Sequence, residues 1–548
     1  MTTHFITANI LNASTDGIDL GSGDQLFIAS GITVAGGTNG SAETGASSAS
    51  GGISAQILGT LWGESNGLDF YGSAGVDTVF VGTGASVIGV TGTGISLSGN
   101  GDIVTNNGEI SATTALSGTL NAGVSLYGSG GTVTNNGTIS GNFGVFFDAG
   151  GDILNNSGTI DATNDGVIAV TPDAGVVDMI DNSGTIRTSQ SAAITASNEG
   201  AGSIDITNSG HIVGYIALGD GPDSYDGTLG SVTRGVFGEG GNDVLLGGAG
   251  SEYLDGGTGS DVINGGGGND TLLAEGTSAV IDGGDGNDTI SMGPFLTTGD
   301  LIDGGSGKDN LILSGDYSAG FVFAADTMTN VEKLTLGAGF SYKLTMSDGN
   351  VAAGERLTVD ASALTATETL KFNGVDEHDG YYVITGGLAN DTLVGGDGND
   401  TITGGAGDNW ITGGGGADHI IATATEHDRF IYTDVSDSTG VAHDTITGFN
   451  GSYDKLDLDV TVTAVDATVA SGRLSTSSFD TNLTAALTSA HLAAGHAVLF
   501  TPTIGNYSGH TLLVIDANGI AGYQAGQDYV IDITGATNLT HLTTATFI

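Results

Sequence analysis

The sequence predicts an all-β protein: a right-handed parallel β-helix or solenoid, followed by a parallel β-roll and a C-terminal β-rich domain. Two repeats predict this class. A nine-residue unit rich in Gly and Asp recurs between residues 238 and 312 and again between 386 and 421, and a seven-residue unit recurs within residues 1–226. Short units with an aliphatic residue at a constant place are typical of stacked coils, in which each repeat buries its apolar side chain against its neighbours.

The nine-residue unit is clearest at 256–264 and 265–273, where two copies follow each other directly. Glycine occupies the first, second and fourth places, aspartate the sixth and an aliphatic residue the eighth. We expect the glycines to take positive φ and turn carbonyl groups inward, and the aliphatic residue to point into the core from a short strand. A flexible linker or an acidic disordered tract is the alternative, which the strict register disfavours. Further copies begin at Gly283, Gly304, Gly386, Gly395, Gly404 and Gly413.

The aspartate at the sixth place indicates a metal site. Its carboxylate is a hard oxygen ligand that suits calcium rather than zinc or copper, so the sequence predicts Ca²⁺ as the cofactor. The predicted metal-site residues are Asp243, Asp261, Asp270, Asp288, Asp309, Asp391, Asp400 and Asp418, with the glycines Gly256, Gly265, Gly283, Gly304, Gly395, Gly404 and Gly413.

Two nonapeptides are expected to make one flattened turn, so that alternate repeats share an edge of the roll. Three repeats depart from the pattern: Glu252 and Asn409 stand at aspartate places, and 274–282 has no acid at its sixth place. The expected stacks are Asp243 with Asp261, Glu252 with Asp270 and Asp288, Asp391 with Asn409, and Asp400 with Asp418.

The seven-residue unit predicts the β-helix. Val104-Thr105-Asn106-Asn107-Gly108-Glu109-Ile110 returns at 133–139, 154–160, 180–186 and 206–212, with the final isoleucines 29, 21, 26 and 26 residues apart. Strands of fixed length with variable loops suit a parallel β-helix, whereas hairpins with Asn-Gly turns are the alternative. In the β-helix one asparagine per coil falls at the same corner, where a hydrogen-bonded ladder is expected and the following glycine supplies the turn. These asparagines are Asn106, Asn135, Asn156, Asn182 and Asn208.

Changes in composition divide the chain into five predicted segments. Residues 1–226 form the β-helix-like domain, for anchoring or assembly. Residues 227–312 and 386–433 form two β-roll blocks, separated by 313–385, which we interpret as further coils or a small β-insert. Residues 434–548 form the capping and C-terminal domain, in which Asp480 or Thr481 is expected to N-cap a helix carrying Leu483, Leu487 and Leu492.

The charge and composition of the chain argue against several binding partners and types of site. The chain has 62 Asp and Glu against 10 Lys and Arg, a formal net charge of -52. Binding to nucleic acid or to an anionic membrane is therefore not expected, since phosphate contacts need basic residues, and the acid excess needs cations to neutralise it in a compact state. There is no cysteine, so disulfides and thiolate metal sites are excluded. Neither a membrane-spanning run nor a cleaved export signal is visible.

The chain from 238 to 548 resembles the RTX family of Gram-negative bacteria. The resemblance rests on the nonapeptides, on the closing segment from Asp428-Arg429-Phe430-Ile431-Tyr432 to Asp454-Lys455-Leu456-Asp457-Leu458, and on the C-terminus. It implies an extracellular, calcium-binding protein exported by the type I secretion machinery through an uncleaved C-terminal signal. The tail with Gly522-Tyr523-Gln524 and the Asn330-Val331-Glu332 spacer are most similar to RTX surface-layer proteins, which implies anchoring to the cell surface through lipopolysaccharide.

The resemblance leaves an enzyme open, because RTX proteins include proteases, lipases and epimerases. No His-Glu-x-x-His is present, and no α/β pattern surrounds any Gly-x-Ser-x-Gly. A β-helical lyase or epimerase acting on polysaccharide needs cations for the substrate carboxylate and a base for its α-proton. Through residue 230 the chain offers only Arg187, His4 and His211. We therefore do not expect an enzyme.

Two non-catalytic functions remain open from the sequence. The first is a structural protein that assembles with itself into a calcium-stabilised surface layer (S-layer) or filament. The second is an adhesin or biofilm-matrix protein that binds a surface glycan. The length of the chain favours the first, because adhesins of this class carry many more repeats.

Overall fold

A computed structural model describes residues 1–11, 16–36, 44–49, 51–72, 74–114, 120–170, 175–196, 202–423 and 425–548. The chain forms two compact units, Met1–Asp288 and Thr289–Ile548. Both are built from coils of parallel β-strands, and helix accounts for 4% of the structure. The predicted parallel β-solenoid is confirmed.

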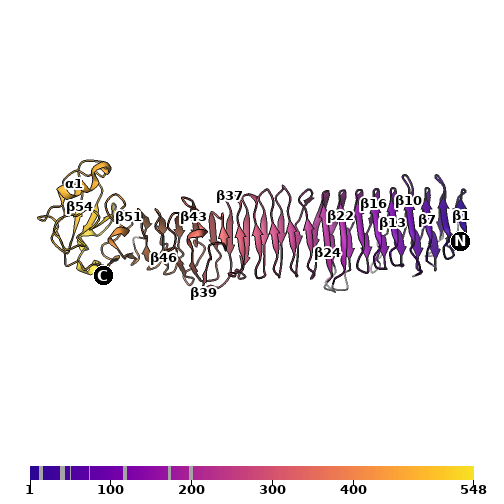
Figure 1. Ribbon diagram of the computed structural model, residues 1–548, viewed down its shortest axis with the longest axis horizontal. Helices are drawn as coiled ribbons and strands as arrows, with labels where there is room; N and C mark the ends of the chain where they lie inside the picture. The colour runs from indigo at the N-terminus through magenta and orange to yellow at the C-terminus, as the bar shows by residue number, and fades with distance from the viewer. Residues whose placement is uncertain are drawn as a thin grey trace. The chain divides into compact units, whose positions relative to one another are not determined.

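The first unit begins with parallel coils stacked one after another (Figure 1), and each of these coils has three strands. Each strand pairs in parallel with its counterpart one coil away, so that three strand series run along the unit. The first series is β1 (Thr3–Ile6), β4 (Gln25–Ile28), β7 (Ser54–Ile57), β10 (Thr78–Val81), β13 (Ile103–Asn106), β16 (Thr132–Asn135), β19 (Ile153–Asn156), β22 (Val177–Asn182) and β24 (Ser203–Asn208). The second is β2 (Ile10–Leu11), β5 (Thr33–Gly36), β8 (Thr60–Gly63), β11 (Ser86–Gly89), β14 (Glu109–Ala112), β17 (Thr138–Gly141), β20 (Thr159–Ala162), β23 (Thr185–Ala196), β25 (His211–Ala217) and β27 (Ser231–Val232). The third begins with β3 (Ile18–Asp19), β6 (Ala46–Ser48), β9 (Leu68–Phe70), β12 (Ile95–Leu97), β15 (Ala122–Leu126), β18 (Phe143–Phe147) and β21 (Val167–Ala169).

The core of these coils is a column of aliphatic side chains. Val104, Val133, Leu154, Ile180 and Ile206 occupy one register position in successive coils and are at most 1% exposed. Strand residues alternate between core and solvent, and burial of each such side chain contributes roughly 1.5–3 kcal/mol. The parallel pairing shows that the alternative of separate hairpins is wrong.

The predicted asparagine ladder is confirmed. The Nδ2 atom of Asn106 donates to Oδ1 of Asn135 at 2.8 Å, and the same bond joins Asn135 to Asn156, Asn156 to Asn182 and Asn182 to Asn208 at 2.7, 2.7 and 2.8 Å. All five side chains are buried. Each side-chain amide thereby provides a hydrogen-bond partner for the next amide, so these buried polar groups are not left unpaired in the apolar interior.

The glycine two places after each ladder asparagine is explained by close packing between coils and not by the predicted turn. A Cβ on Gly137 would lie 2.1 Å from the carbonyl oxygen of Gly108, and one on Gly158 would lie 2.1 Å from that of Gly137. Neither glycine has positive φ. The corner therefore needs glycine because successive coils approach closely there.

Toward the end of the first unit the coil loses one of its three strands. The second and third strands merge in β23 and β25, and each later coil has one strand in each of two series. One series is β26 (Ser224–Asp226), β29 (Val244–Leu246), β31 (Val262–Asn264) and β33 (Val280–Asp282), and the other is β28 (Val236–Phe237), β30 (Tyr253–Asp255) and β32 (Thr271–Leu273). Val244 pairs with Val262, which is 18 residues later, so two nonapeptides make one turn, as predicted.

The second unit consists of further parallel coils followed by a C-terminal domain. One series is β35 (Thr289–Gly293), β38 (Asn310–Leu313), β41 (Lys333–Leu336), β43 (Arg356–Asp360), β45 (Tyr381–Thr385), β47 (Thr401–Thr403), β49 (His419–Ile421) and β51 (Asp444–Thr447). The other is β39 (Tyr317–Val322), β42 (Tyr342–Thr345), β44 (Leu370–Asn373), β46 (Thr392–Val394), β48 (Trp410–Thr412), β50 (Arg429–Tyr432) and β52 (Lys455–Leu458), and β36 (Leu301–Asp303) pairs with β40 (Met328–Thr329). Residues 313–385, for which coils and a separate insert were both open, form coils of this solenoid.

The C-terminal domain covers the last coil of the second unit. Antiparallel strands β54 (His496–Phe500), β55 (Leu512–Ile515) and β56 (Tyr529–Asp532) form its sheet, and β56 pairs in parallel with β51. The helix α1 (Phe479–Ala486) starts after Ser478, slightly earlier than the predicted caps Asp480 and Thr481. Its Leu483 packs with Leu487 and Leu492, which lie beyond the helix end.

Candidate metal centre

The sixth-place carboxylates of the first unit form two ladders along the solenoid. The backbone N–H of Asp243 donates to Oδ1 of Asp261 at 3.0 Å. On the other edge, the N–H of Glu252 donates to Oδ1 of Asp270 at 2.7 Å, and the N–H of Asp270 to Oδ1 of Asp288 at 2.7 Å. The stacks predicted for this block are confirmed.

The second unit repeats the arrangement. The N–H of Asp391 donates to Oδ1 of Asn409 at 2.9 Å, and the N–H of Asp400 donates to Oδ1 of Asp418 at 2.8 Å. These are the predicted pairs. Each rung joins one coil to the next through a carboxylate or amide oxygen, so the ladder fixes the spacing of successive loops.

Asp309 lies in the same kind of rung, although its partner comes from outside the nonapeptides. Its N–H donates to Oε2 of Glu332 at 2.7 Å. From the sequence, Glu332 was expected only as part of the Asn330-Val331-Glu332 spacer. The longer glutamate side chain reaches the place that aspartate occupies elsewhere.

The second oxygen of several ladder carboxylates is buried without a donor. Oδ2 of Asp243, Asp261, Asp270 and Asp418 has no hydrogen-bond partner among the described residues, and these side chains are at most 2% exposed. A buried carboxylate oxygen without a partner is strongly unfavourable unless a cation neutralises it. Asp391 and Asp400 differ, because their Oδ2 atoms accept the N–H of Gly387 and Gly396.

The first-place glycines make room around these oxygens. A Cβ on Gly256 would lie 2.7 Å from Oδ2 of Asp261, and one on Gly265 would lie 2.5 Å both from Oδ2 of Asp270 and from the carbonyl oxygen of Gly283. Corresponding contacts at Gly395 with Asp400 and at Gly413 with Asp418 are 2.1 Å.

The predicted positive φ is found at second and fourth places such as Gly257 and Gly259, at 71° and 151°, and not at the first place. Gly304 serves close packing as well, because its Cβ would lie 2.0 Å from the carbonyl oxygen of Asn330. The first-place glycine is therefore required by the close approach of carboxylate and carbonyl oxygens, a correction to the sequence analysis.

The donor set fits calcium. Calcium takes roughly six to eight oxygen ligands from carboxylates, backbone carbonyls and water, and the edges offer stacked carboxylates beside glycine carbonyls. Asp243, Asp261, Asp270 and Asp418, with the carbonyl groups of the adjoining glycine loops, are the residues that would hold the ion. The bound ion supplies the positive charge that the buried carboxylates otherwise lack.

Burial also changes the acidity of the ladder. It raises the pKa of Asp243 to about 7 and the pKa of Asp261 and Asp270 to about 6, and the neighbouring carboxylates add to the rise at Asp243 and Asp270. Burial and the proximity of Asp444 raise the pKa of Asp418 as well. Without a cation these groups keep their protons to a higher pH than a free carboxyl group, so calcium and protons compete for the same oxygens.

The departures from the consensus are explained by their contacts. Asn409 keeps the rung through Oδ1, and its Nδ2 donates to the carbonyl oxygen of Gly407 at 3.0 Å. Oε2 of Glu252 accepts the N–H of Gly248 at 3.3 Å. In the repeat without an acid, Ala279 occupies the ladder place and is fully buried.

The ladders extend beyond the residues that the sequence predicted. The N–H of Asp223 donates to Oδ1 of Asp243 at 2.9 Å. In the second unit, the N–H of Asp418 donates to Asp444 and the N–H of Asn409 to Asp428, both at 2.9 Å. Asp223 and Asp428 stand directly before a short strand, and Asp444 is the first residue of β51.

A similar ladder runs through the three-stranded coils. The N–H of Asp77 donates to Oδ1 of Asp102 at 2.8 Å, and the N–H of Asp152 to Oδ1 of Asp178 at 2.8 Å. Oδ2 of Asp77, Asp152 and Asp178 is buried without a partner among the described residues. Burial raises the pKa of Asp152 to about 8 and that of Asp178 to about 6.

Comparison with known families agrees with this geometry. Residues 237–272, 278–293 and 385–420 match the RTX calcium-binding nonapeptide repeat, in four copies. The chain therefore carries calcium-binding RTX repeats. No curated protein shows significant sequence similarity to it.

Among the described residues, no helix has both the length and the apolar character needed to cross a bilayer.

Proposed function

We propose that this protein is a structural, calcium-dependent protein of a Gram-negative cell surface, which leaves the cell by type I secretion and assembles with itself into a surface layer or filament. The observation that carries the proposal is the pair of buried carboxylate ladders, in which the second oxygens of Asp243, Asp261, Asp270 and Asp418 lack donors among the described residues. The ladders belong to the scaffold of the solenoid itself, since every rung joins two coils. Calcium on these oxygens therefore acts as a structural element of the fold.

The charge of the chain explains why calcium controls the folded state. A net charge of -52 repels itself in a compact state, and only cations at the stacked carboxylates relieve that repulsion. Extracellular calcium modules bind in the range of roughly 10⁻⁴–10⁻³ M. Such sites are empty in the cytoplasm and filled outside, which couples folding to export.

The distribution of cations supports a structural rather than a catalytic function. Arg187 is the one Lys or Arg among residues 1–230, and its Nη2 forms an ion pair with Oδ2 of Asp161. The chain thus offers no spare guanidinium there for a substrate carboxylate. Lyase or epimerase chemistry on a polyanion needs such a group.

A polar groove favours the adhesin as the second candidate. The groove holds about 280 Å³ and lies beside the asparagine ladder. Its lining contains no aromatic, Lys, Arg or His residue, so a glycan finds hydrogen bonds but no stacking surface or cation there. We therefore rank glycan binding below self-assembly. The lining residues are Thr134, Asn136, Asn155, Asn156, Ser157, Asp181, Asn182, Ser183, Thr207 and Ser209.

Electron microscopy of the purified full-length protein tests the proposal. With millimolar calcium we expect ordered sheets or filaments, and addition of a chelator should disperse them. Particles that stay monomeric at every calcium concentration contradict self-assembly. Binding of such monomers to purified surface glycans then supports the adhesin instead.

A further inference from the structure

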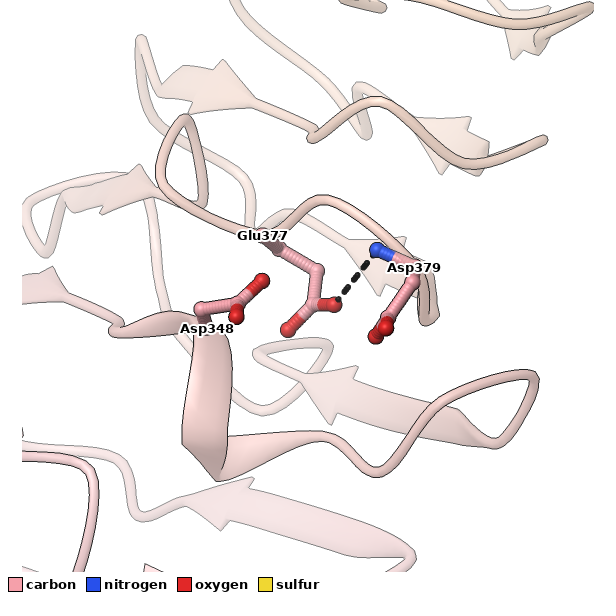
Figure 2. Close-up of side chains that lie close together, drawn as sticks. All are labelled: Asp348, Glu377 and Asp379. Atoms are coloured by element: carbon pink, nitrogen blue, oxygen red, sulfur yellow. Dashed lines mark hydrogen bonds between the residues drawn. The ribbon is translucent and has the colours of Figure 1, made fainter.

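Three acidic side chains from two successive coils meet in the second unit, outside the matched nonapeptides. Asp348 begins the short helix η1 (Asp348–Asn350), and Glu377 and Asp379 lie in the loop between β44 and β45. One carboxylate oxygen from each lies within 4.8 Å of the other two. Figure 2 shows the carboxylate of Glu377 between those of Asp348 and Asp379.

Glu377 is the buried member of this acidic trio. It is 0% exposed, and its Oε1 accepts the N–H of Gly380 at 2.7 Å and the N–H of Asp379 at 3.2 Å. Its Oε2 has no hydrogen-bond partner among the described residues. A fully buried carboxylate oxygen beside two further carboxylates needs a positive charge.

The groups around the trio provide little of that charge. The backbone N–H of His378 donates to Oδ1 of Asp348 at 3.0 Å, and its Nδ1 lies 3.2 Å from the same oxygen. Its side chain is 63% exposed. The nearby carboxylates Asp376 and Asp397 add negative charge. Neutralisation of Glu377 must therefore come from a bound cation or a proton.

The trio lies on the edge that the second group of nonapeptides continues. The N–H of Asp397 donates to the carbonyl oxygen of Glu377 at 2.9 Å, and the N–H of Tyr382 donates to Oδ1 of Asp400 at 2.6 Å. Asp400 in turn stacks on Asp418. The loop with Glu377 thus precedes the first carboxylate of this ladder by one coil.

We propose that Asp348, Glu377 and Asp379 bind a calcium ion in addition to those held by the nonapeptide repeats. All three ligands are hard carboxylate oxygens, which suit calcium rather than zinc or copper. Asp348 and Asp379 are exposed, so water completes the coordination shell, as calcium allows. The ion joins the loop after β42 to the loop after β44 and thereby closes the carboxylate edge at its first coil. This proposal does not depend on self-assembly.

The test counts bound calcium ions on the full-length protein by native mass spectrometry after dialysis against calcium. Glu377→Gln keeps a carbonyl oxygen for Gly380 and removes the charge, and the double variant Asp348→Asn/Asp379→Asn alters only exposed side chains. Both should bind one ion fewer than the unaltered protein. Asp376→Asn, an exposed acid in the same loop outside the trio, is the matched control and should keep the full number.

Terbium luminescence gives a second, local readout. Tyr381 and Tyr382 follow the loop directly and can sensitise a lanthanide bound there, so the variants should lose that emission while Asp376→Asn retains it. Full calcium counts in the double variant overturn the proposal, and that variant decides the matter if Glu377→Gln does not fold. Loss of an ion in Asp376→Asn as well also overturns it, because the loss then reflects charge in general.

Discussion

Asn409 is a natural asparagine in a ladder of aspartates, and replacing it by aspartate should create a calcium-dependent rung. In the unaltered chain its Oδ1 accepts the N–H of Asp391 at 2.9 Å, and its Nδ2 donates to the carbonyl oxygen of Gly407 at 3.0 Å. Asn409→Asp keeps the first bond. It replaces the second bond by a carboxylate oxygen without a donor, as at Asp418, whose Oδ2 has no hydrogen-bond partner among the described residues.

The expected change in unfolding free energy follows from these two hydrogen bonds and from mass action of calcium. Without calcium, losing the Nδ2 hydrogen bond and leaving a buried acceptor without a donor should cost about 1–3 kcal/mol. With calcium, each additional bound ion stabilises the folded coil by RT ln(1 + [Ca²⁺]/Kd), which is about 1.4 kcal/mol for every tenfold rise above Kd. A plot of unfolding free energy against log calcium concentration should therefore steepen by about 1.4 kcal/mol per decade.

Trp410 reports on this coil. Its ring centroid lies 4.8 Å from the guanidinium carbon of Arg429, and the other tryptophan, Trp62, lies in the first unit. Denaturant unfolding followed by tryptophan fluorescence at several calcium concentrations gives the slope. Asp418→Asn should reduce the slope by a similar amount, and Asn399→Asp, at an exposed position, should leave it unchanged. Parallel lines for all four proteins refute the assignment of calcium to the ladder oxygens.

Three further predictions follow from other parts of the structure. Chelation of calcium should unfold residues 238–421, seen as rapid amide hydrogen exchange in that range, and unchanged protection contradicts a structural role for calcium. Asn156→Ala removes two buried ladder bonds of 2.7 Å and should lower the unfolding free energy by about 2–4 kcal/mol, measured by circular dichroism against Asn155→Ala as a control. In chelator, the first unit should lose stability as pH rises from about 4 through 8, because burial raises the pKa of Asp152 to about 8 and that of Asp178 to about 6. The folded state then binds more protons than the unfolded state across that window; Asp152→Asn/Asp178→Asn should flatten the pH profile of thermal unfolding, and an unchanged profile contradicts the reasoning.

The strict repeats made much of the fold predictable from sequence. In a coil of fixed length, the spacing of Asp243 and Asp261 by 18 residues places them one above the other, so the rung between them follows directly. The asparagine ladder was predictable for the same reason, even though its coils vary in length, because the seven-residue core fixes the corner where Asn135 and Asn156 meet.

Other features could not be read from a repeat. Asp348 and Glu377 meet because two loops of different length and sequence converge. No repeat pattern in the sequence predicts this contact. The buried pair Asp152 and Asp178 lies outside the nonapeptide repeats: Asp152 directly precedes β19, and Asp178 is the second residue of β22. The role of Gly256 was misread, because a sequence shows that glycine is present but not whether φ or a close approach requires it.

The most direct test of the central claim is cryo-electron microscopy of the surface of cells that produce the protein, imaged with calcium and after treatment with a chelator. We expect an ordered layer or filaments on the cell surface in calcium, and their release into the medium as unassembled protein after chelation. A surface without such structures in calcium, or one that keeps them unchanged after chelation, contradicts the account.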